Sequence, residues 1–196
     1  MIELARPRYG HFDLGTGYHG DVWLNLDALF LRPALLRPHV RLLADRLREH
    51  RVDAVCGPME GGAFLAYALA DLLEVAFLPA YRAAAPDAEP GAATAYRLAW
   101  AGDAGEGIGG WRVAIADDAV NAGTAVKACA AQLRDCGAVP VAVATLLSVG
   151  PASRTIPAAL SVPFYPVDEV QSRAWLPAEC RLCAEGVPLT DPYPQD

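Results

Sequence analysis

Two adjacent carboxylates close an apolar run and stand directly before a loop of small residues. Residues 113–125 read VAIADDAVNAGTA, so Asp117 and Asp118 end a strand-like segment, and Gly123 and Thr124 open a helix-like one. Backbone N–H groups of such a turn can surround a phosphate. Two acids beside a phosphate suit a sugar, because carboxylates accept hydrogen bonds from a diol and stabilise positive charge on the ring. The alternative is a pair of acids that only caps a helix.

Two further segments have chemistry that fits a phosphorylated ligand. Residues 57–66 read GPMEGGAFLA, and Gly61 and Gly62 let backbone amides approach a phosphate closely. Residues 10–23 read GHFDLGTGYHGDVW and combine glycines with aromatic and histidine side chains. Phe12 and Trp23 offer faces on which a planar base can stack, although apolar packing is the favoured interpretation of both.

Residues 113–125 resemble the ribose-phosphate-binding signature of type I phosphoribosyltransferases, and the letters DDAVNAGTA are similar to the orotate phosphoribosyltransferase version. Residues 57–66 resemble the pyrophosphate loop of that family. Residues 10–23 look like its Phe-x-Leu-x-Ser-Gly segment, which forms part of a hood over the base. Residues 175–189 look like the ending of one orotate phosphoribosyltransferase subgroup. The resemblance covers residues 10 to about 150 in addition to that ending.

The resemblance implies a pentosyltransferase that moves ribose 5-phosphate from phosphoribosyl pyrophosphate to a nucleobase. Orotate is the favoured base, which gives orotidine 5′-phosphate and pyrophosphate in pyrimidine biosynthesis. Mg²⁺ is the expected cofactor, and a homodimer is the expected assembly. Two alternatives stay open: an enzyme of the same fold that acts on another base, and a non-catalytic protein that senses phosphoribosyl pyrophosphate.

The same resemblance assigns roles to individual residues. Asp117 and Asp118 hold the ribose hydroxyls and are candidates for contact with Mg²⁺, although no direct protein ligand of the metal is assigned. The residues expected to bind the 5′-phosphate are Ala119, Val120, Asn121, Ala122, Gly123, Thr124 and Ala125. Backbone amides are presented to pyrophosphate by Met59, Glu60, Gly61 and Gly62. The base is bordered by Phe12, Thr16, Gly17, Tyr18 and His19.

The sequence departs from the family in a stretch rich in Ala, Gly, Pro and acids. Orotate phosphoribosyltransferases carry a lysine and a histidine on a mobile flap, but residues 82–110 contain neither. Arg82 and Arg97 are the candidates for leaving-group contacts, because arginine binds diphosphate oxygens bidentately. The plainer interpretation of both is ordinary surface arginine. Glu60 has the wrong charge for direct contact with pyrophosphate.

Cys180 and Cys183 form a Cys-x-x-Cys pair, which is half of a zinc site. The four histidines are all remote from this pair in sequence: His11, His19, His39 and His50. The favoured interpretation is therefore two thiols in a C-terminal turn. A metal site shared across a dimer is the alternative.

Alternating helix-like and strand-like segments must position these groups. Helices are expected over 33–50, 62–73 and 123–136. The first has an apolar stripe of Leu36, Val40, Leu43 and Leu47, the second is apolar nearly all round and is expected to be buried, and the third is closed by Gly137. Strands are expected over 52–56, 75–81, 112–116 and 139–147. This order predicts an α/β fold with a parallel central sheet flanked by helices. We expect one phosphoribosyltransferase domain over 1–196, with a core at about 31–150, a small hood from 1–30 and 150–196, and a flap at about 82–110.

Composition narrows the class of protein. The 196 residues are 54% hydrophobic and 20% charged, which excludes a disordered chain. A net charge of −7 argues against nucleic acid as a partner. No apolar run reaches the length of a membrane span, and the N-terminal residues lack the apolar core of a signal peptide. Five cysteines are not a disulfide framework, so we expect a cytoplasmic protein whose partners are small molecules.

Overall fold

Continuous apolar runs form the inner strands of a parallel sheet in the computed structural model, which describes residues 1–14, 17–59, 61–82, 96–98 and 107–192. Five strands run parallel: β3 (Ala54–Pro58), β4 (Ala76–Arg82), β6 (Arg112–Val120), β7 (Val139–Val149) and β8 (Phe164–Val170). The antiparallel β5 (Tyr96–Leu98) adds one edge, and the sheet order is β5-β4-β3-β6-β7-β8. The expected α/β fold with a parallel central sheet is confirmed.

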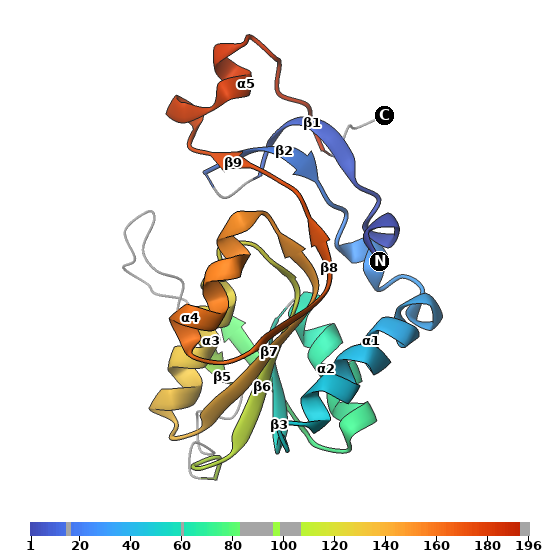
Figure 1. Cartoon of the computed structure of the whole chain (residues 1–196), viewed down its shortest axis with the longest axis vertical. Coiled ribbons are helices and arrows are strands. Elements are labelled where there is room, and N and C mark those ends of the chain that lie inside the picture. Colours follow the sequence, from blue (N-terminus) through green and yellow to red (C-terminus); the bar gives the residue numbers. More distant parts are fainter. Residues whose placement is uncertain (15–16, 60, 83–95, 99–106, 193–196) are drawn as a thin grey trace.

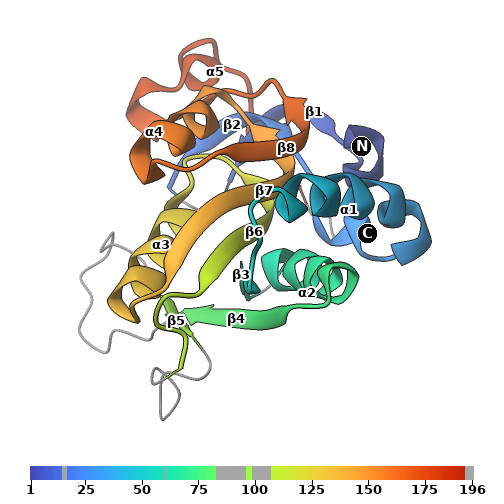
Figure 2. The same ribbon diagram turned by 60° about the horizontal axis from the view of Figure 1, so that its bottom comes forward.

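Helices cover both faces of this sheet (Figure 2). On one face lie α1 (Pro33–Arg48) and α2 (Gly61–Leu73), and on the other lie α3 (Thr124–Asp135) and α4 (Ile156–Leu160). Neighbouring strand residues point to opposite faces. Val55 therefore packs in the cluster that holds α1 and α2, whereas Cys56 packs in the cluster that holds α3.

A second, smaller layer lies over the carboxyl ends of the strands (Figure 1). Its sheet has the order β1-β2-β9, from β1 (Arg8–Asp13), β2 (His19–Trp23) and β9 (Ala174–Trp175). Short helices complete it: η1 (Ile2–Ala5), η2 (Asp27–Leu29), η4 (Pro177–Glu179) and α5 (Arg181–Ala184). We call this layer the hood. In the core, a short helix η3 (Pro151–Thr155) follows β7. Among the described residues, every helix is too short or too polar to cross a bilayer.

The clearest sequence patterns have the expected structures. The stripe of Leu36, Val40, Leu43 and Leu47 is buried along α1. Gly137 ends α3 in a left-handed conformation with φ 76°, and its N–H donates to the Arg134 carbonyl at 2.9 Å. A side chain at this position would be strained, which is why glycine closes the helix.

Two elements differ from their predicted form. β6 does not stop at residue 116 but continues through Asp117 and Asp118 to Val120, because β7 pairs with it as far as Ser148. The acids therefore belong to the strand rather than to a loop. α2, whose nearly continuous apolar sequence predicts a buried helix, is buried on one side only: it lies in an outer layer, so Phe64 and Tyr67 are 63% and 64% exposed.

The segment after residue 150 contributes to both layers. β8 pairs with β7 and completes the core sheet, so the core extends past the boundary of about 150 predicted from sequence. Pro166 lies within β8, and an edge strand tolerates the proline because that side needs no further N–H donor. Of the predicted flap at 82–110, residues 83–95 and 99–106 lie outside the described part of the chain. Among the flap residues that the structure describes, those of β5 pair with the end of β4, and Ile108 is buried.

Candidate functional site

The expected site lies at the point where the chain changes direction across the sheet. β3 and β6 are parallel neighbours; from β3 the chain continues to β4 on one side, and from β6 to β7 on the other. Crevices form at the carboxyl ends of strands that part in this way. The loop that begins at Met59 and the acid pair at Asp117 and Asp118 both lie there.

The two acids lie against the first turn of α2. Asp117 is 8% exposed and Asp118 is half-buried. A Cβ atom at Gly61 would overlap the Asp118 carboxylate, and a Cβ at Gly62 would lie 2.6 Å from Asp117 Oδ1. Glycine at both positions therefore lets the start of the helix approach the two carboxylates closely. The structure brings together the loop assigned to pyrophosphate and the acids assigned to the ribose.

Burial gives this acid pair an unusual electrostatic state. It raises the pKa of the Asp117 carboxyl well above the usual range, and the neighbouring Asp118 raises it further. Burial also raises the pKa of Asp118, against the opposing effect of the Ala119 N–H, which donates to Asp118 Oδ1 at 2.8 Å. None of the ion pairs among the described residues involves either acid. The pair therefore favours a cationic ligand, and its oxygens are ligands of the kind Mg²⁺ prefers.

The loop assigned to the 5′-phosphate runs from the end of β6 into α3. Asn121, Ala122 and Thr124 are exposed, whereas Val120 is buried and Ala119 and Ala125 are half-buried. Gly123 has φ +71°, and a Cβ there would overlap Ile156. The result is an exposed turn that leads into the N-terminus of a 12-residue helix, where unpaired N–H groups favour anions.

The chain's single lysine lies at this loop. Lys127 Nζ donates to the Ala122 carbonyl at 2.8 Å, and the Lys127 N–H donates to the Gly123 carbonyl at 2.8 Å. This side chain was not among the predicted site residues. The sequence signal for this placement is that Lys127 lies three residues after Thr124, where the glycine-containing loop opens a helix.

The other loop residues are placed less centrally. Met59 is 39% exposed, and its N–H donates to the Ala80 carbonyl at 2.8 Å. Glu60 lies outside the described residues. Arg82 ends β4 and has an exposed side chain. Arg97 lies on β5, and its backbone pairs with that of Tyr81 on β4. The strands that carry them, β4 and β5, lie on the far side of β3 from β6.

The hood residues predicted to border the base fall into three groups. Phe12 is 1% exposed and lies 6.4 Å from the Trp23 ring, in line with apolar packing. Thr16 lies outside the described residues, whereas Gly17 and Tyr18 are exposed. His19 is 9% exposed, and its Nδ1 lies 3.1 Å from Nε2 of another histidine, His11.

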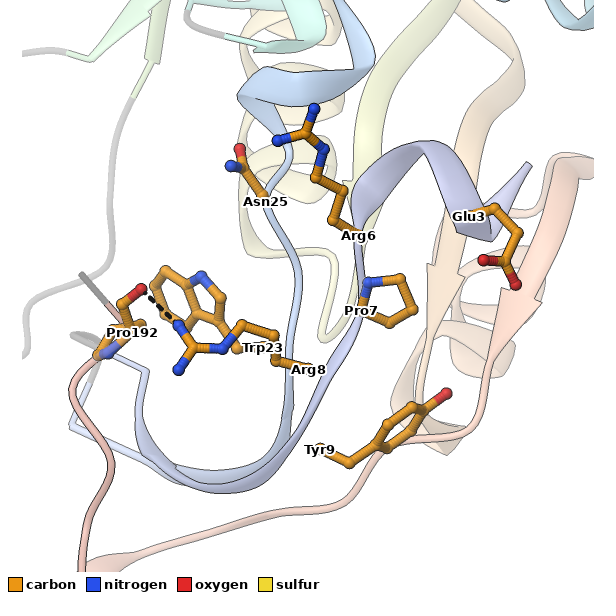
Figure 3. A pocket seen from close by; sticks show the side chains of 8 residues that line it. All are labelled: Glu3, Arg6, Pro7, Arg8, Tyr9, Trp23, Asn25 and Pro192. Atoms are coloured by element: carbon orange, nitrogen blue, oxygen red, sulfur yellow. Dashed lines mark hydrogen bonds between the residues drawn. The ribbon is translucent and has the colours of Figure 1, made fainter. Parts of the chain in front are cut away.

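A pocket of about 640 Å³ opens on the hood itself (Figure 3). Arg6, Arg8 and Trp23 contribute cationic and aromatic side chains to it, and Arg8 Nη1 donates to the Pro192 carbonyl at 2.8 Å. Its remaining lining residues are Glu3, Pro7, Tyr9, Asn25 and Pro192. This pocket is built from the two ends of the chain and does not include the acid pair on the core.

The sequence interpretation of the C-terminal cysteines needs correction. Histidines that are remote in sequence lie beside them in the fold: ligand atoms of His11, His19, Cys180 and Cys183 all lie within 4.8 Å of one another. Pairing of β1 with β2 and of β2 with β9 brings these side chains together. In the sequence, the only signal for this cluster beyond the Cys-x-x-Cys pair is a pair of histidines eight residues apart near the N-terminus. That their strands meet the C-terminal residues is known only from the fold.

Known proteins resemble this chain over most of its length. No family model matches the sequence. An orotate phosphoribosyltransferase of Caldanaerobacter subterraneus subsp. tengcongensis is 30% identical over 183 residues, covering 93% of this chain and 88% of that protein. One from Carboxydothermus hydrogenoformans is 30% identical over 194 residues, covering 98% and 93%.

The solved structures agree with this relationship at the level of the fold. The crystal structure of orotate phosphoribosyltransferase from Aeropyrum pernix superposes with a TM-score of 0.66 and 21% identity, over 86% of this chain and 90% of that one. The sequence similarity, the parallel sheet and the acid pair at its switch point are mutually consistent. The chain belongs to the orotate phosphoribosyltransferase family.

Proposed function

We propose that this protein transfers ribose 5-phosphate from phosphoribosyl pyrophosphate to orotate, forming orotidine 5′-phosphate and pyrophosphate. The observation that carries the proposal is the close approach of two glycines, Gly61 and Gly62, to Asp117 and Asp118 at the sheet's switch point. Family membership supports the same reaction, because the 30%-identical relatives are orotate phosphoribosyltransferases.

The reaction needs charge stabilisation and alignment more than covalent catalysis. A base nitrogen forms a bond to C1 of the ribose, the bond from C1 to the diphosphate oxygen breaks, and pyrophosphate leaves with the electron pair. Positive charge develops on the ribose ring during this exchange. In this proposal Asp117 and Asp118 accept hydrogen bonds from the ribose hydroxyls and stabilise that charge.

The two loops hold the donor at its two ends. Exposed Asn121, Ala122 and Thr124, at the start of α3, bind the 5′-phosphate through backbone N–H groups and the Thr124 hydroxyl. The first turn of α2, at Gly61 and Gly62, presents amides to the pyrophosphate. Mg²⁺, when bound, neutralises diphosphate charge, and Asp117 and Asp118 are the residues that would hold it with the ribose hydroxyls.

Arg82 and Arg97 remain our candidates for the leaving group, and Tyr18 with residues 16–17 our candidates for the base. The homodimer also remains a proposal, supported by the exposed Phe64 and Tyr67 on α2, since large exposed apolar patches mark interfaces. The cytoplasmic location proposed from the cysteine pattern rests on free thiols, such as the buried Cys56 and Cys129.

The test is absorbance-monitored consumption of orotate with phosphoribosyl pyrophosphate and Mg²⁺, run beside the double variant Asp117→Asn/Asp118→Asn. We expect turnover that the double variant abolishes. The flap region without lysine or histidine favours one other reading, a protein that senses the donor. Calorimetric binding of the donor without turnover of orotate would contradict our proposal. Assays with adenine and uracil would then separate an enzyme for another base from a sensor.

A further inference from the structure

Four metal-binding side chains meet inside the hood, away from the acid pair. His11 comes from β1 and His19 from β2, whereas Cys180 is the N-cap of α5 and Cys183 lies within that helix. Three of the four are buried, and Cys183 is exposed. Two imidazoles and two thiols that face one another from three chain segments are a set that zinc sites use.

The distances between these atoms match a tetrahedral site. His11 Nε2 lies 3.1 Å from His19 Nδ1 and 3.3 Å from Cys180 Sγ. Cys183 Sγ lies 3.7 Å from His11 Nε2 and 3.3 Å from His19 Nδ1. Zinc bonds nitrogen at about 2.0–2.1 Å and sulfur at about 2.3 Å. At tetrahedral angles, two nitrogen ligands are then about 3.3 Å apart, and a nitrogen and a sulfur ligand are about 3.6 Å apart. Four of the six separations are therefore close to those of a tetrahedral zinc site, and the other two are below 4.8 Å.

The surroundings orient one of the imidazoles for metal binding. His11 Nδ1 lies 2.7 Å from the Val187 carbonyl oxygen, and because a carbonyl only accepts, Nδ1 carries the proton. Nε2 is then the unprotonated nitrogen, and it faces the two thiols and His19. Histidine ligands of metals are oriented by just such a bond from the other ring nitrogen.

We propose that His11, His19, Cys180 and Cys183 bind one Zn²⁺ that has a structural role in the hood. Soft thiolates with imidazoles select zinc over Mg²⁺, so the site is chemically distinct from the carboxylates at Asp117 and Asp118. Four protein ligands leave no open position for substrate, which is the arrangement of structural rather than catalytic zinc.

The metal would tie residues near the two ends of the chain into one unit. His19 directly follows Gly17 and Tyr18, which the family resemblance assigns to the base, and His11 lies on the strand that precedes them, β1. Zinc would therefore anchor the end of β1 and the start of β2 to α5. It would also occupy the His19 nitrogen that faces His11, so His19 acts here as a ligand and not as a contact to the base.

A direct measurement is the metal content of the whole protein, purified under reducing conditions with Zn²⁺ supplied and with magnesium buffers free of chelator. We expect about one zinc per chain by mass spectrometry of the metal. Replacement with Co²⁺ should give the visible absorption of a tetrahedral site and a thiolate-to-cobalt charge-transfer band. Neither readout depends on enzymatic activity, so failure of the proposed reaction would leave this test intact.

Two variants remove ligands from the site. Cys183→Ser changes the exposed ligand and is therefore the least disruptive to packing, and His11→Asn removes a buried one. Each should weaken zinc affinity by more than about 100-fold and abolish the charge-transfer band or shift the cobalt spectrum. The matched controls Cys136→Ser and His39→Asn change the same residue types outside the cluster and should retain the metal.

Three outcomes would overturn the proposal. The first is a reduced, zinc-supplied protein that holds less than about 0.1 zinc per chain. The second is a Cys183→Ser variant that binds zinc as tightly as the unaltered chain. The third is a disulfide between Cys180 and Cys183 that persists under those reducing conditions and excludes the metal.

Discussion

Gly61 meets Asp118 where the first turn of α2 touches the end of β6, so closely that a single methyl group at Gly61 would overlap the carboxylate. These residues are 57 positions apart in sequence, one in the first turn of α2 and the other near the end of β6. The contact makes the position of an acid depend on the absence of a side chain elsewhere. It links the geometry of the proposed ribose subsite to that of the proposed pyrophosphate loop.

The variant Gly61→Ala should lower kcat/KM for the proposed reaction by about 10- to 100-fold, because displacing a positioned group by about 1 Å has effects of that size. Thermal stability should change little, since alanine favours the helix and Asp118 is only half-buried. Steady-state kinetics and a melting curve measure both. Gly107→Ala, where a Cβ meets nothing within 4 Å, is the control. Unchanged kinetics in Gly61→Ala would show that the acid tolerates the shift.

Burial of Asp117 should make stability depend on pH. Because burial raises its pKa above the usual 3.8, the folded protein binds this proton more tightly than the unfolded chain does. The stabilisation is fully present below pH 3.8 and is lost as pH rises through the raised pKa. Asp117→Asn mimics the protonated form, so it should melt about 2–6 °C above the unaltered protein at pH 8 and close to it at pH 4.

Melting curves of the two proteins between pH 4 and 8 test this directly. Asp45→Asn is the control, since Asp45 is an exposed partner of Arg48 on α1. A difference between Asp117→Asn and the unaltered chain that is constant with pH would contradict a raised pKa as its cause.

Gly123 combines a left-handed backbone with contact against Ile156, so Gly123→Ala should destabilise the fold by two separable effects. The positive φ costs about 1–2 kcal/mol for an L residue, and the overlap with the end of the Ile156 side chain adds to it. Ile156→Val removes that end and alone costs about 0.5–1.5 kcal/mol. The double variant should lose less free energy of unfolding than the sum of the losses in the two single variants. Urea unfolding of all four proteins measures the coupling, and strict additivity would exclude the steric contact.

The exposed aromatic face of α2 predicts the site of self-association. Phe64 is 63% exposed and its ring lies 5.3 Å from that of Phe30. Phe64→Glu places a charge in this patch and should reduce the mass measured by light scattering from twice 20.8 kDa to 20.8 kDa. Leu42→Glu alters a 49% exposed residue on α1 and should leave the mass unchanged. Equal masses for Phe64→Glu and the unaltered protein would place the interface elsewhere.

Removal of zinc should loosen the hood and leave the core intact. After treatment with a chelator, backbone amides of β2 and β9 should exchange with deuterium faster, because they depend on the cluster that includes His19. Amides of the central β6 and β7 should keep their protection. Hydrogen-exchange mass spectrometry resolves the two layers. Faster exchange in both layers alike would show that the metal supports the whole fold rather than the hood.

Local patterns in the sequence predicted the core well. The apolar stripe of α1 and the closing Gly137 are determined by neighbouring residues, and both were confirmed. The extent of β6 was underestimated, because its pairing partner lies about 30 residues further along the chain. The exposure of Phe64 depends on how many layers cover α2, which periodicity does not report.

The site shows the same division between local and long-range information. The order of acids, small residues and glycine in one stretch singles out Asp117 and Asp118 as candidates from the sequence alone. The meeting of His11 with Cys180 did not follow from spacing, because these residues are 169 positions apart and are brought together by the hood sheet, in which β2 pairs with β9 shortly before Cys180. β8 escaped prediction because proline and two acids interrupt its apolar pattern.

The hood also sets an order for folding during synthesis. The Val187 carbonyl that His11 contacts emerges 176 residues later, and the Thr190 N–H that donates to the His11 carbonyl at 2.6 Å emerges later still. A two-stranded ribbon such as β1–β2 is marginally stable alone. The first strands made are therefore the last to find their partners, while the central sheet is already complete. Until then Phe12, which is buried in the folded protein, is exposed to solvent or to a chaperone.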